Sequence, residues 1–125
     1  MGYRSEVTAA FYVHKIHEHD WPALKLFVDE NFPEELKESL REKKSDTHHG
    51  YIFSEADVKW YDSYPEVVAF QRFVSNFLEV ADGENDLGWA YEFVRIGENT
   101  EDIEETSSDG ADYVLRVVRT TEIDF

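Results

Sequence analysis

Five histidines fall into two groups of a kind that can bind a metal ion. The groups are His14, His17 and His19, and His48 and His49. Each group lies at the end or at the start of a predicted strand, so the two can meet in the folded chain. The carboxylate of Glu18, Asp20 or Asp46 would then complete a nitrogen and oxygen site for zinc, manganese or iron. Such a site would support a metal-assisted hydrolase. The spacing H-x-x-H-x-H-D is not an established zinc motif, and the alternative is that these are hydrogen-bonded surface histidines.

Residues 97–112, GENTEDIEETSSDGAD, contain seven acidic residues and no basic one. The acidic residues are Glu98, Glu101, Asp102, Glu104, Glu105, Asp109 and Asp112. Duplex DNA carries one charge per roughly 1.7 Å of its axis, so an ordered ridge of carboxylates would imitate phosphate spacing and bind a protein with a basic surface. The alternative is that the acid-rich connection only keeps a small, aromatic-rich protein soluble.

Three aromatic residues at a predicted helix start form a further set of binding candidates. Trp60, Tyr61 and Tyr64 lie in the stretch WYDSYPEV. Tyr and Trp are enriched among the residues that dominate binding energy at protein interfaces, so these three are candidate anchors for a partner. The alternative is that they pack against the core around the helix start.

Other catalytic arrangements are missing from the sequence. No serine lies in a G-x-S-x-G motif, and the glycines form no phosphate-binding loop. The absence of cysteine removes thiol nucleophiles, thiolate metal sites and disulfides together. We therefore expect a protein that is not an enzyme and that holds no cofactor.

Alternation of apolar and polar residues predicts the strands that position these groups. It indicates strands at 5–14, 88–96 and 113–123, with the last two paired as a hairpin. Residues 51–61 are predicted to form either a hairpin of two short segments or one bulged strand.

Helical spacing predicts two main helices. The first begins near Asp20 and breaks near Asn31, and a further helical piece runs from Pro33 to Lys44. The second, the central core helix, begins with a capping box formed by Ser63 and Glu66. Its apolar stripe is Val67, Phe70, Phe73, Val74, Phe77 and Leu78.

This order of elements predicts a single α+β domain over residues 1–125. We expect a two-layer arrangement with an antiparallel sheet and two main helices on one of its faces, a variant of the ferredoxin-like fold. The other face is less polar than a solvated sheet face should be. Its apolar residues are Tyr12, Val94, Ile96, Val114 and Val118. Either the register is off by one residue, or a partner or a second subunit, as in a homodimer, covers this face.

Composition limits the class of protein and the class of partner. The chain has 125 residues, of which 42% are hydrophobic, and a net charge of −16. Its hydrophobic content is too high for a disordered chain despite the charge. The acidity predicts repulsion from DNA, RNA and anionic membranes and favours a partner with a basic surface. No apolar run approaches the roughly 18 residues of a membrane span, and the first residues do not resemble a signal peptide.

Three blocks of the sequence resemble a group of small accessory proteins of tailed bacteriophages. The blocks are MGYRSEV at the start of the chain, WYDSYPEV at 60–67 and EFVRIGE at 92–98. They follow the expected order, and the similarity covers most of the chain. The resemblance implies a context, namely a non-structural protein in the cytoplasm of an infected bacterium, and brings no catalytic residues with it. By analogy, small acidic phage proteins often block host enzymes or defence systems by occupying nucleic-acid-binding surfaces.

We therefore expect a phage-encoded accessory protein that binds and inhibits or redirects a host protein, involved in defence or nucleic-acid handling, through its acidic surface. Two alternatives remain open. One is a metal-dependent hydrolase centred on the histidines, and the other is a structural protein that oligomerises through the outer sheet face.

Overall fold

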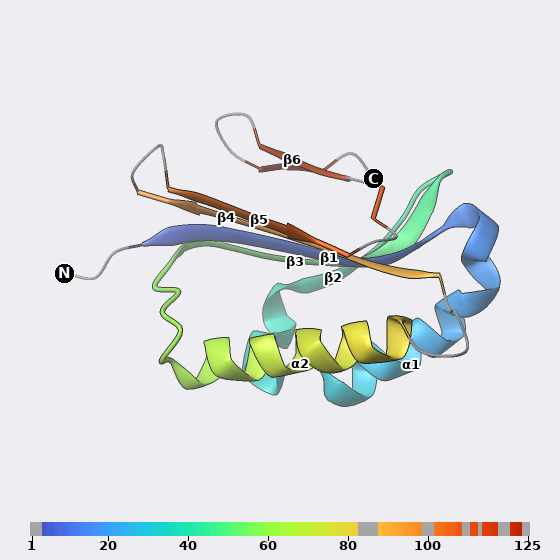
Figure 1. The fold of residues 1–125 in the computed structure, drawn as a ribbon, viewed down its shortest axis with the longest axis horizontal. Helices are drawn as coiled ribbons and strands as arrows, with labels where there is room; N and C mark the ends of the chain where they lie inside the picture. Colours follow the sequence, from blue (N-terminus) through green and yellow to red (C-terminus); the bar gives the residue numbers. More distant parts are fainter. Residues whose placement is uncertain are drawn as a thin grey trace.

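A five-stranded sheet organises the chain (Figure 1). The structure is a computed structural model that describes residues 4–82, 88–98, 102–108, 111–112, 114–117 and 121–123. The strands lie in the order β2-β3-β1-β4-β5, and every neighbouring pair is antiparallel. Their bounds are β1 (Ser5–His14), β2 (Leu40–Lys44), β3 (His48–Val58), β4 (Trp89–Gly97) and β5 (Ile103–Ser107). The predicted α+β class with an antiparallel sheet is confirmed.

The two α-helices, α1 (Trp21–Asn31) and α2 (Pro65–Ala81), lie on one side of this sheet (Figure 1). The described residues also form two short 3₁₀ helices, η1 (Lys15–Asp20) between β1 and α1 and η2 (Glu34–Ser39) between α1 and β2. Phe11 of β1 stands at the centre of the core between sheet and helices, with its ring centroid 5.2 Å from those of Phe73 and Phe77 in α2. None of the helices formed by the described residues is both long enough and apolar enough to cross a membrane.

Helix α2 has the apolar stripe that the sequence predicts but not the predicted cap. Val67, Phe70, Phe73 and Phe77 are buried, as helical spacing requires. The N-cap residue is Tyr64, and its side chain makes no capping hydrogen bond. The predicted capping box of Ser63 and Glu66 is therefore wrong, because the helix begins one residue later than that box requires.

Residues 40–44 form a strand where helical spacing predicted the end of a helix. Leu40–Lys44 is β2, which pairs with β3 at one edge of the sheet. The helical piece that follows Pro33 is only the short η2. Leu, Arg, Glu and Lys all favour helix, but intrinsic propensity is a small term that tertiary context often outweighs. Backbone pairing with β3 therefore decides the conformation here.

Strand β3 is one bulged strand, so that alternative is confirmed as far as Val58 and the hairpin is wrong. Residues 59–61, which the prediction included, lie beyond the end of the strand. The register with β1 shifts between the pairs Ser5–Val58 and Val7–Glu55. Asp57, within the bulge, has a φ of 57°, a left-handed conformation that Asp tolerates better than most residues.

The C-terminal part of the chain covers the outer face of the sheet. The predicted pairing of 88–96 with 113–123 is wrong, because β4 pairs with β1 and β5. Instead, β6 (Leu115–Val117) and β7 (Thr121–Ile123) pair with each other as a separate hairpin, which lies above the sheet in Figure 1. Val118 lies outside the described residues.

This hairpin explains why the outer face is apolar. Val114 and Leu115 pack on that face in a second buried cluster, and the sheet residues of this cluster are Ala10, Tyr12, Ile52, Ala90 and Val94. The predicted register of β4 was therefore right, and the chain itself covers these residues. The hairpin adds a third layer to the two that the sequence predicted.

Candidate functional site

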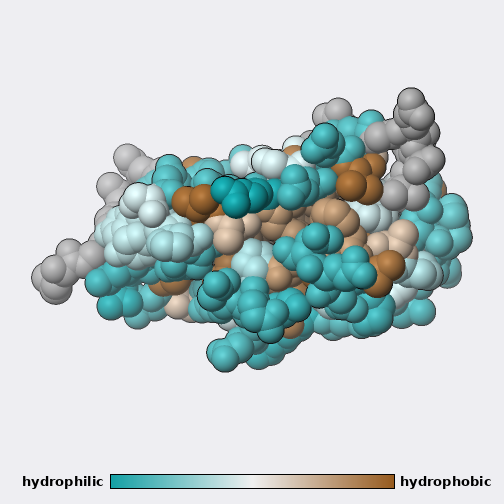
Figure 2. All heavy atoms as spheres, turned by 90° about the horizontal axis from the view of Figure 1, so that it is seen from below, coloured by the Kyte–Doolittle hydropathy of each residue, from teal (hydrophilic) through white to brown (hydrophobic). Residues whose placement is uncertain are grey.

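A cleft of about 480 Å³ opens between α2 and the inner face of β4 and β5. Its lining residues are Trp60, Tyr61, Asp62, Phe70, Gln71, Val74, Ser75, Tyr91, Phe93, Arg95, Asp102, Glu104 and Thr106. Aromatic rings make up much of its floor, and polar and charged groups stand at its rim. Figure 2 shows the helix side of the molecule, where apolar residues run along the middle between hydrophilic borders.

Arg95 holds the charged rim of the cleft together. Its Nη1 and Nη2 donate to the two carboxylate oxygens of Asp102 at 3.1 and 2.9 Å, and its Nε donates to Glu104 at 3.2 Å. The hydrogen bonds to Asp102 have the largest effect on the pKa of the Arg95 guanidinium, and those to Asp102 and Glu104 both raise it. Bidentate pairing of this kind is directional, so Arg95 fixes β5 and the residue before it against β4.

The Tyr91 hydroxyl is a polar group of the cleft that sequence reasoning missed. Burial raises the pKa of Tyr91, and the nearby Glu104 carboxylate acts in the same direction, so the hydroxyl stays protonated. Within the described part of the chain it has no hydrogen-bond partner, although the residue lines the cleft. A donor is therefore available to a ligand there.

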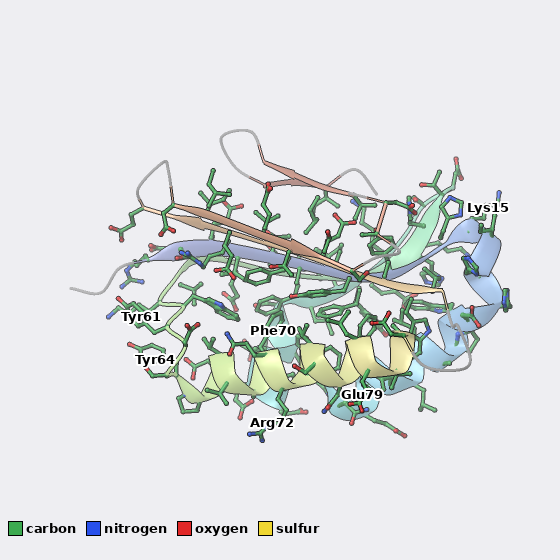
Figure 3. The ribbon with its side chains drawn as sticks, in the orientation of Figure 1. Lys15, Tyr61, Tyr64, Phe70, Arg72 and Glu79 are labelled. Atoms are coloured by element: carbon green, nitrogen blue, oxygen red, sulfur yellow. The ribbon has the colours of Figure 1, made fainter. Side chains whose placement is uncertain are left out.

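The aromatic anchor candidates precede α2 in the chain, and Figure 3 shows Tyr61 and Tyr64 near the N-terminal end of this helix. Trp60 packs against the core, with its ring centroid 5.3 Å from that of Phe70, and also lines the cleft. Tyr61 lines the cleft as well and contacts Tyr64 edge to face, at 5.1 Å between centroids. Tyr64 is the N-cap residue and does not line the cleft. Two of the three candidates, Trp60 and Tyr61, thus line the cleft.

The acidic residues of 97–112 do not form one continuous row. Asp102 and Glu104 face the cleft, and Glu105 is exposed on the other face of β5. Glu98 accepts a hydrogen bond from the Arg4 amide at 2.8 Å. Asp112 lies elsewhere, against His48. Glu101 and Asp109 lie outside the described residues.

The histidines separate into three places. His14 and His48 meet on the outer face with Asp112, whereas His17 and His19 form a second group with Asp20 in and beside η1. His49 points to the inner side, where its ring stacks on Trp21 with a centroid distance of 3.6 Å. Neither group includes Glu18 or Asp46.

His49 lies between two carboxylates. Its Nδ1 is 3.0 Å from Glu18 Oε1, and its Nε2 is 3.0 Å from Glu42 Oε2. Contacts at both ring nitrogens, together with the stacking on Trp21, hold the His49 ring in one orientation. This cluster ties η1 and α1 to the edge of the sheet.

The Glu18 contact predicts a pH-dependent contribution to stability. The hydrogen bond from His49 holds the pKa of the Glu18 carboxyl below its ordinary value. A carboxyl with a depressed pKa stabilises the fold above its unfolded-state pKa, and this contribution is lost as the pH falls through its folded-state pKa. We expect Glu18→Gln to lower the free energy of unfolding at neutral pH by less than about 1 kcal/mol, because the side chain is 41% exposed. Urea unfolding of both proteins should show this difference vanish in acid, and a difference unchanged by pH would contradict the assignment.

A buried carboxylate, Glu92, joins the sheet to the C-terminal segment, and sequence reasoning missed it. It is 3% exposed. It accepts hydrogen bonds from the Tyr12 hydroxyl and from the amides of Val114 and Leu115, the latter two at 2.9 and 3.1 Å. The sequence feature that could have indicated a buried carboxylate was the position of this acidic residue within the apolar run of β4.

Comparison with protein-family models, with curated proteins and with solved structures gives no match for this chain. The comparisons therefore assign no family to this chain.

Proposed function

We propose that the protein is a non-enzymatic binding protein that holds a cationic segment of a partner protein in the cleft beside α2. The observation that carries this proposal is that two sets of residues, singled out separately in the sequence, line the same hollow. Trp60 and Tyr61 come from the aromatic set, and Asp102 and Glu104 come from the acidic set.

The chemistry of the cleft favours a Lys or Arg side chain as its occupant. Among the described residues, the lining has three carboxylates, those of Asp62, Asp102 and Glu104, against one guanidinium, that of Arg95. A cation over the aromatic floor gains about 0.5–2 kcal/mol from cation–π attraction, depending on how far it is desolvated. The net charge of −16 steers a basic partner toward the protein over a longer range and repels nucleic acid.

The bacteriophage resemblance extends this proposal to a biological setting. The partner would be a host protein with a basic surface that acts in defence or nucleic-acid handling, and binding in the host bacterial cytoplasm would inhibit or redirect it. The carboxylates then take the place of nucleic-acid phosphates on that surface.

We also propose that the sheet is a ferredoxin-like variant. The order β2-β3-β1-β4, with α1 between β1 and β2 and α2 between β3 and β4, supports this. On this view β5 extends one edge of the sheet, and the β6–β7 hairpin is an addition on its outer face.

The proposal predicts that Tyr61→Ala combined with Asp62→Asn weakens binding of a basic peptide. We expect a loss of about tenfold, which corresponds to 1.4 kcal/mol, from the removal of one aromatic contact and one rim charge. The measurement is fluorescence anisotropy of a labelled peptide rich in Arg and Lys, at low and at physiological salt. Asp102 and Glu104 are left in place because their removal would leave Arg95 unpaired.

The matched control is Glu79→Gln, which removes one negative charge from the solvent side of α2, away from the cleft (Figure 3). It should change affinity less than twofold, about 0.4 kcal/mol. A labelled peptide with Gln in place of each Arg and Lys tests the need for charge. Equal losses for the control and the double variant would show that only net charge matters, and the cleft would not be the binding site.

A further inference from the structure

We propose that His14, His48 and Asp112 form a binding site for one divalent transition-metal ion, with Zn²⁺ as the ion that suits these ligands best. The three residues come from the end of β1, the start of β3 and the C-terminal segment. One ligating atom from each lies within 4.8 Å of the others. The site is on the outer side of the sheet, opposite the cleft, and does not depend on the function proposed above.

His48 is already oriented as a metal-ligating histidine usually is. Its Nε2 lies 2.9 Å from Asp112 Oδ2, and its Nδ1 lies 2.8 Å from the Thr47 hydroxyl oxygen. When Nδ1 donates to Thr47, the Nε2 lone pair points toward Asp112 and is available to an ion. Such second hydrogen bonds fix the tautomer and ring orientation of metal-bound histidines.

The other two ligands are held by neighbouring groups. The Asp112 amide donates to the Tyr12 hydroxyl at 2.7 Å, while the Asp112 side chain is 43% exposed and so leaves the site open to solvent. The His14 ring meets that of His48 edge to face, at 5.1 Å between centroids. His14 Nδ1 accepts a hydrogen bond from the Ile16 amide at 3.2 Å.

Metal binding through His14 Nε2 places the ring proton on Nδ1, so the hydrogen bond from Ile16 is given up. At 3.2 Å this bond is at the long end of the normal range, and a ligand bond to the ion replaces it. The ion would thus connect the ends of two strands to the C-terminal segment.

Two imidazoles and one carboxylate make a recognised ligand set. Zinc sites with three protein ligands complete their tetrahedron with water, and the partly open position of Asp112 leaves room for this. Magnesium and calcium prefer all-oxygen sites, so they should bind much more weakly. The second group, His17, His19 and Asp20, lies within four consecutive positions and its His19 side chain is 74% exposed, which makes it a useful control.

Isothermal titration with zinc sulfate tests the proposal on the full chain, purified without an affinity tag and treated with a chelator. We expect one equivalent to bind and magnesium chloride to give no comparable heat. Asp112→Asn and His14→Ala should each weaken zinc binding by more than about tenfold, since even the loss of an outer hydrogen bond costs metal sites 10-fold to 100-fold. The double variant His17→Ala with His19→Ala should keep the affinity of the unaltered protein.

Thermal unfolding gives a second readout. Zinc should raise the midpoint of the unaltered protein and of the His17/His19 variant, but not that of Asp112→Asn. Should His14→Ala fail to fold by circular dichroism, Asp112→Asn alone decides the result. Absence of binding by the unaltered protein, unchanged affinity in Asp112→Asn, or loss of binding in the His17/His19 variant would each overturn the proposal.

Discussion

Replacement of Glu92 by Gln is expected to lower the free energy of unfolding by about 2–3 kcal/mol, which is the range for a buried group that loses charged hydrogen bonds. The Glu92 carboxylate accepts from the Tyr12 hydroxyl and from two backbone amides. An amide in its place directs an N–H toward one of these donors. Burial raises the pKa of Tyr12, and the hydrogen bond to Glu92 acts in the same direction, so Tyr12 cannot relieve the clash by ionising.

Urea unfolding would measure the size of this effect, and hydrogen exchange would locate it in the structure. The amides of Val114 and Leu115 should exchange faster in Glu92→Gln, because they lose the acceptor that holds the C-terminal segment on the sheet. Glu105→Gln, an exposed position on the neighbouring strand, is the matched control, and surface substitutions of this kind usually stay within about 0.5 kcal/mol. Equal stability of the two variants would mean that Glu92 does not anchor the segment.

Replacement of Phe11 by Ala is expected to lower the free energy of unfolding by about 3–5 kcal/mol, the usual cost of truncating a buried Phe. Phe11 is fully buried. Its ring lies close to five other aromatic rings, which come from α2, β4 and the segment after α1. They are Phe32, Phe70, Phe73, Phe77 and Tyr91.

This loss is a large fraction of the roughly 5–15 kcal/mol that stabilises a typical domain. Urea unfolding followed by far-UV circular dichroism would show it as a lower midpoint at an unchanged slope. Leu26→Ala in α1 removes an aliphatic side chain that is 58% exposed, so it should change stability little. If Phe11→Ala were no more harmful than Leu26→Ala, the packing described for β1 would be wrong.

The histidines and the acidic stretch show how far sequence can lead toward a site. The positions of the two histidine groups at the ends of predicted strands indicated that the groups can meet, and His14 does lie near His48. The third member of that group, Asp112, was predicted as part of the acidic ridge. Asp112 is 64 positions from His48 along the chain. The two residues meet because the C-terminal segment folds over the sheet. No local pattern encodes such a contact.

The acidic stretch contains a strand that alternation did not reveal. The segment IEETS has only one large apolar residue, yet it forms β5 because it pairs with β4 and because Glu104 and Asp102 bind Arg95. At a sheet edge, backbone pairing and cross-strand charges can set the conformation without burial of side chains. These contacts also place Asp102 and Glu104 in the same cleft as Trp60 and Tyr61.

The sequence alone determined the elements whose own periodicity matches a buried face. These are β1, α2 and β4, in which apolar side chains repeat at the spacing of the element and point to the core. Tertiary structure alone decided that 40–44 is a strand, that Glu92 is buried, and that the C-terminal hairpin covers the outer face. Each of these depends on pairing or packing between residues far apart in the chain, which local propensity and spacing do not specify.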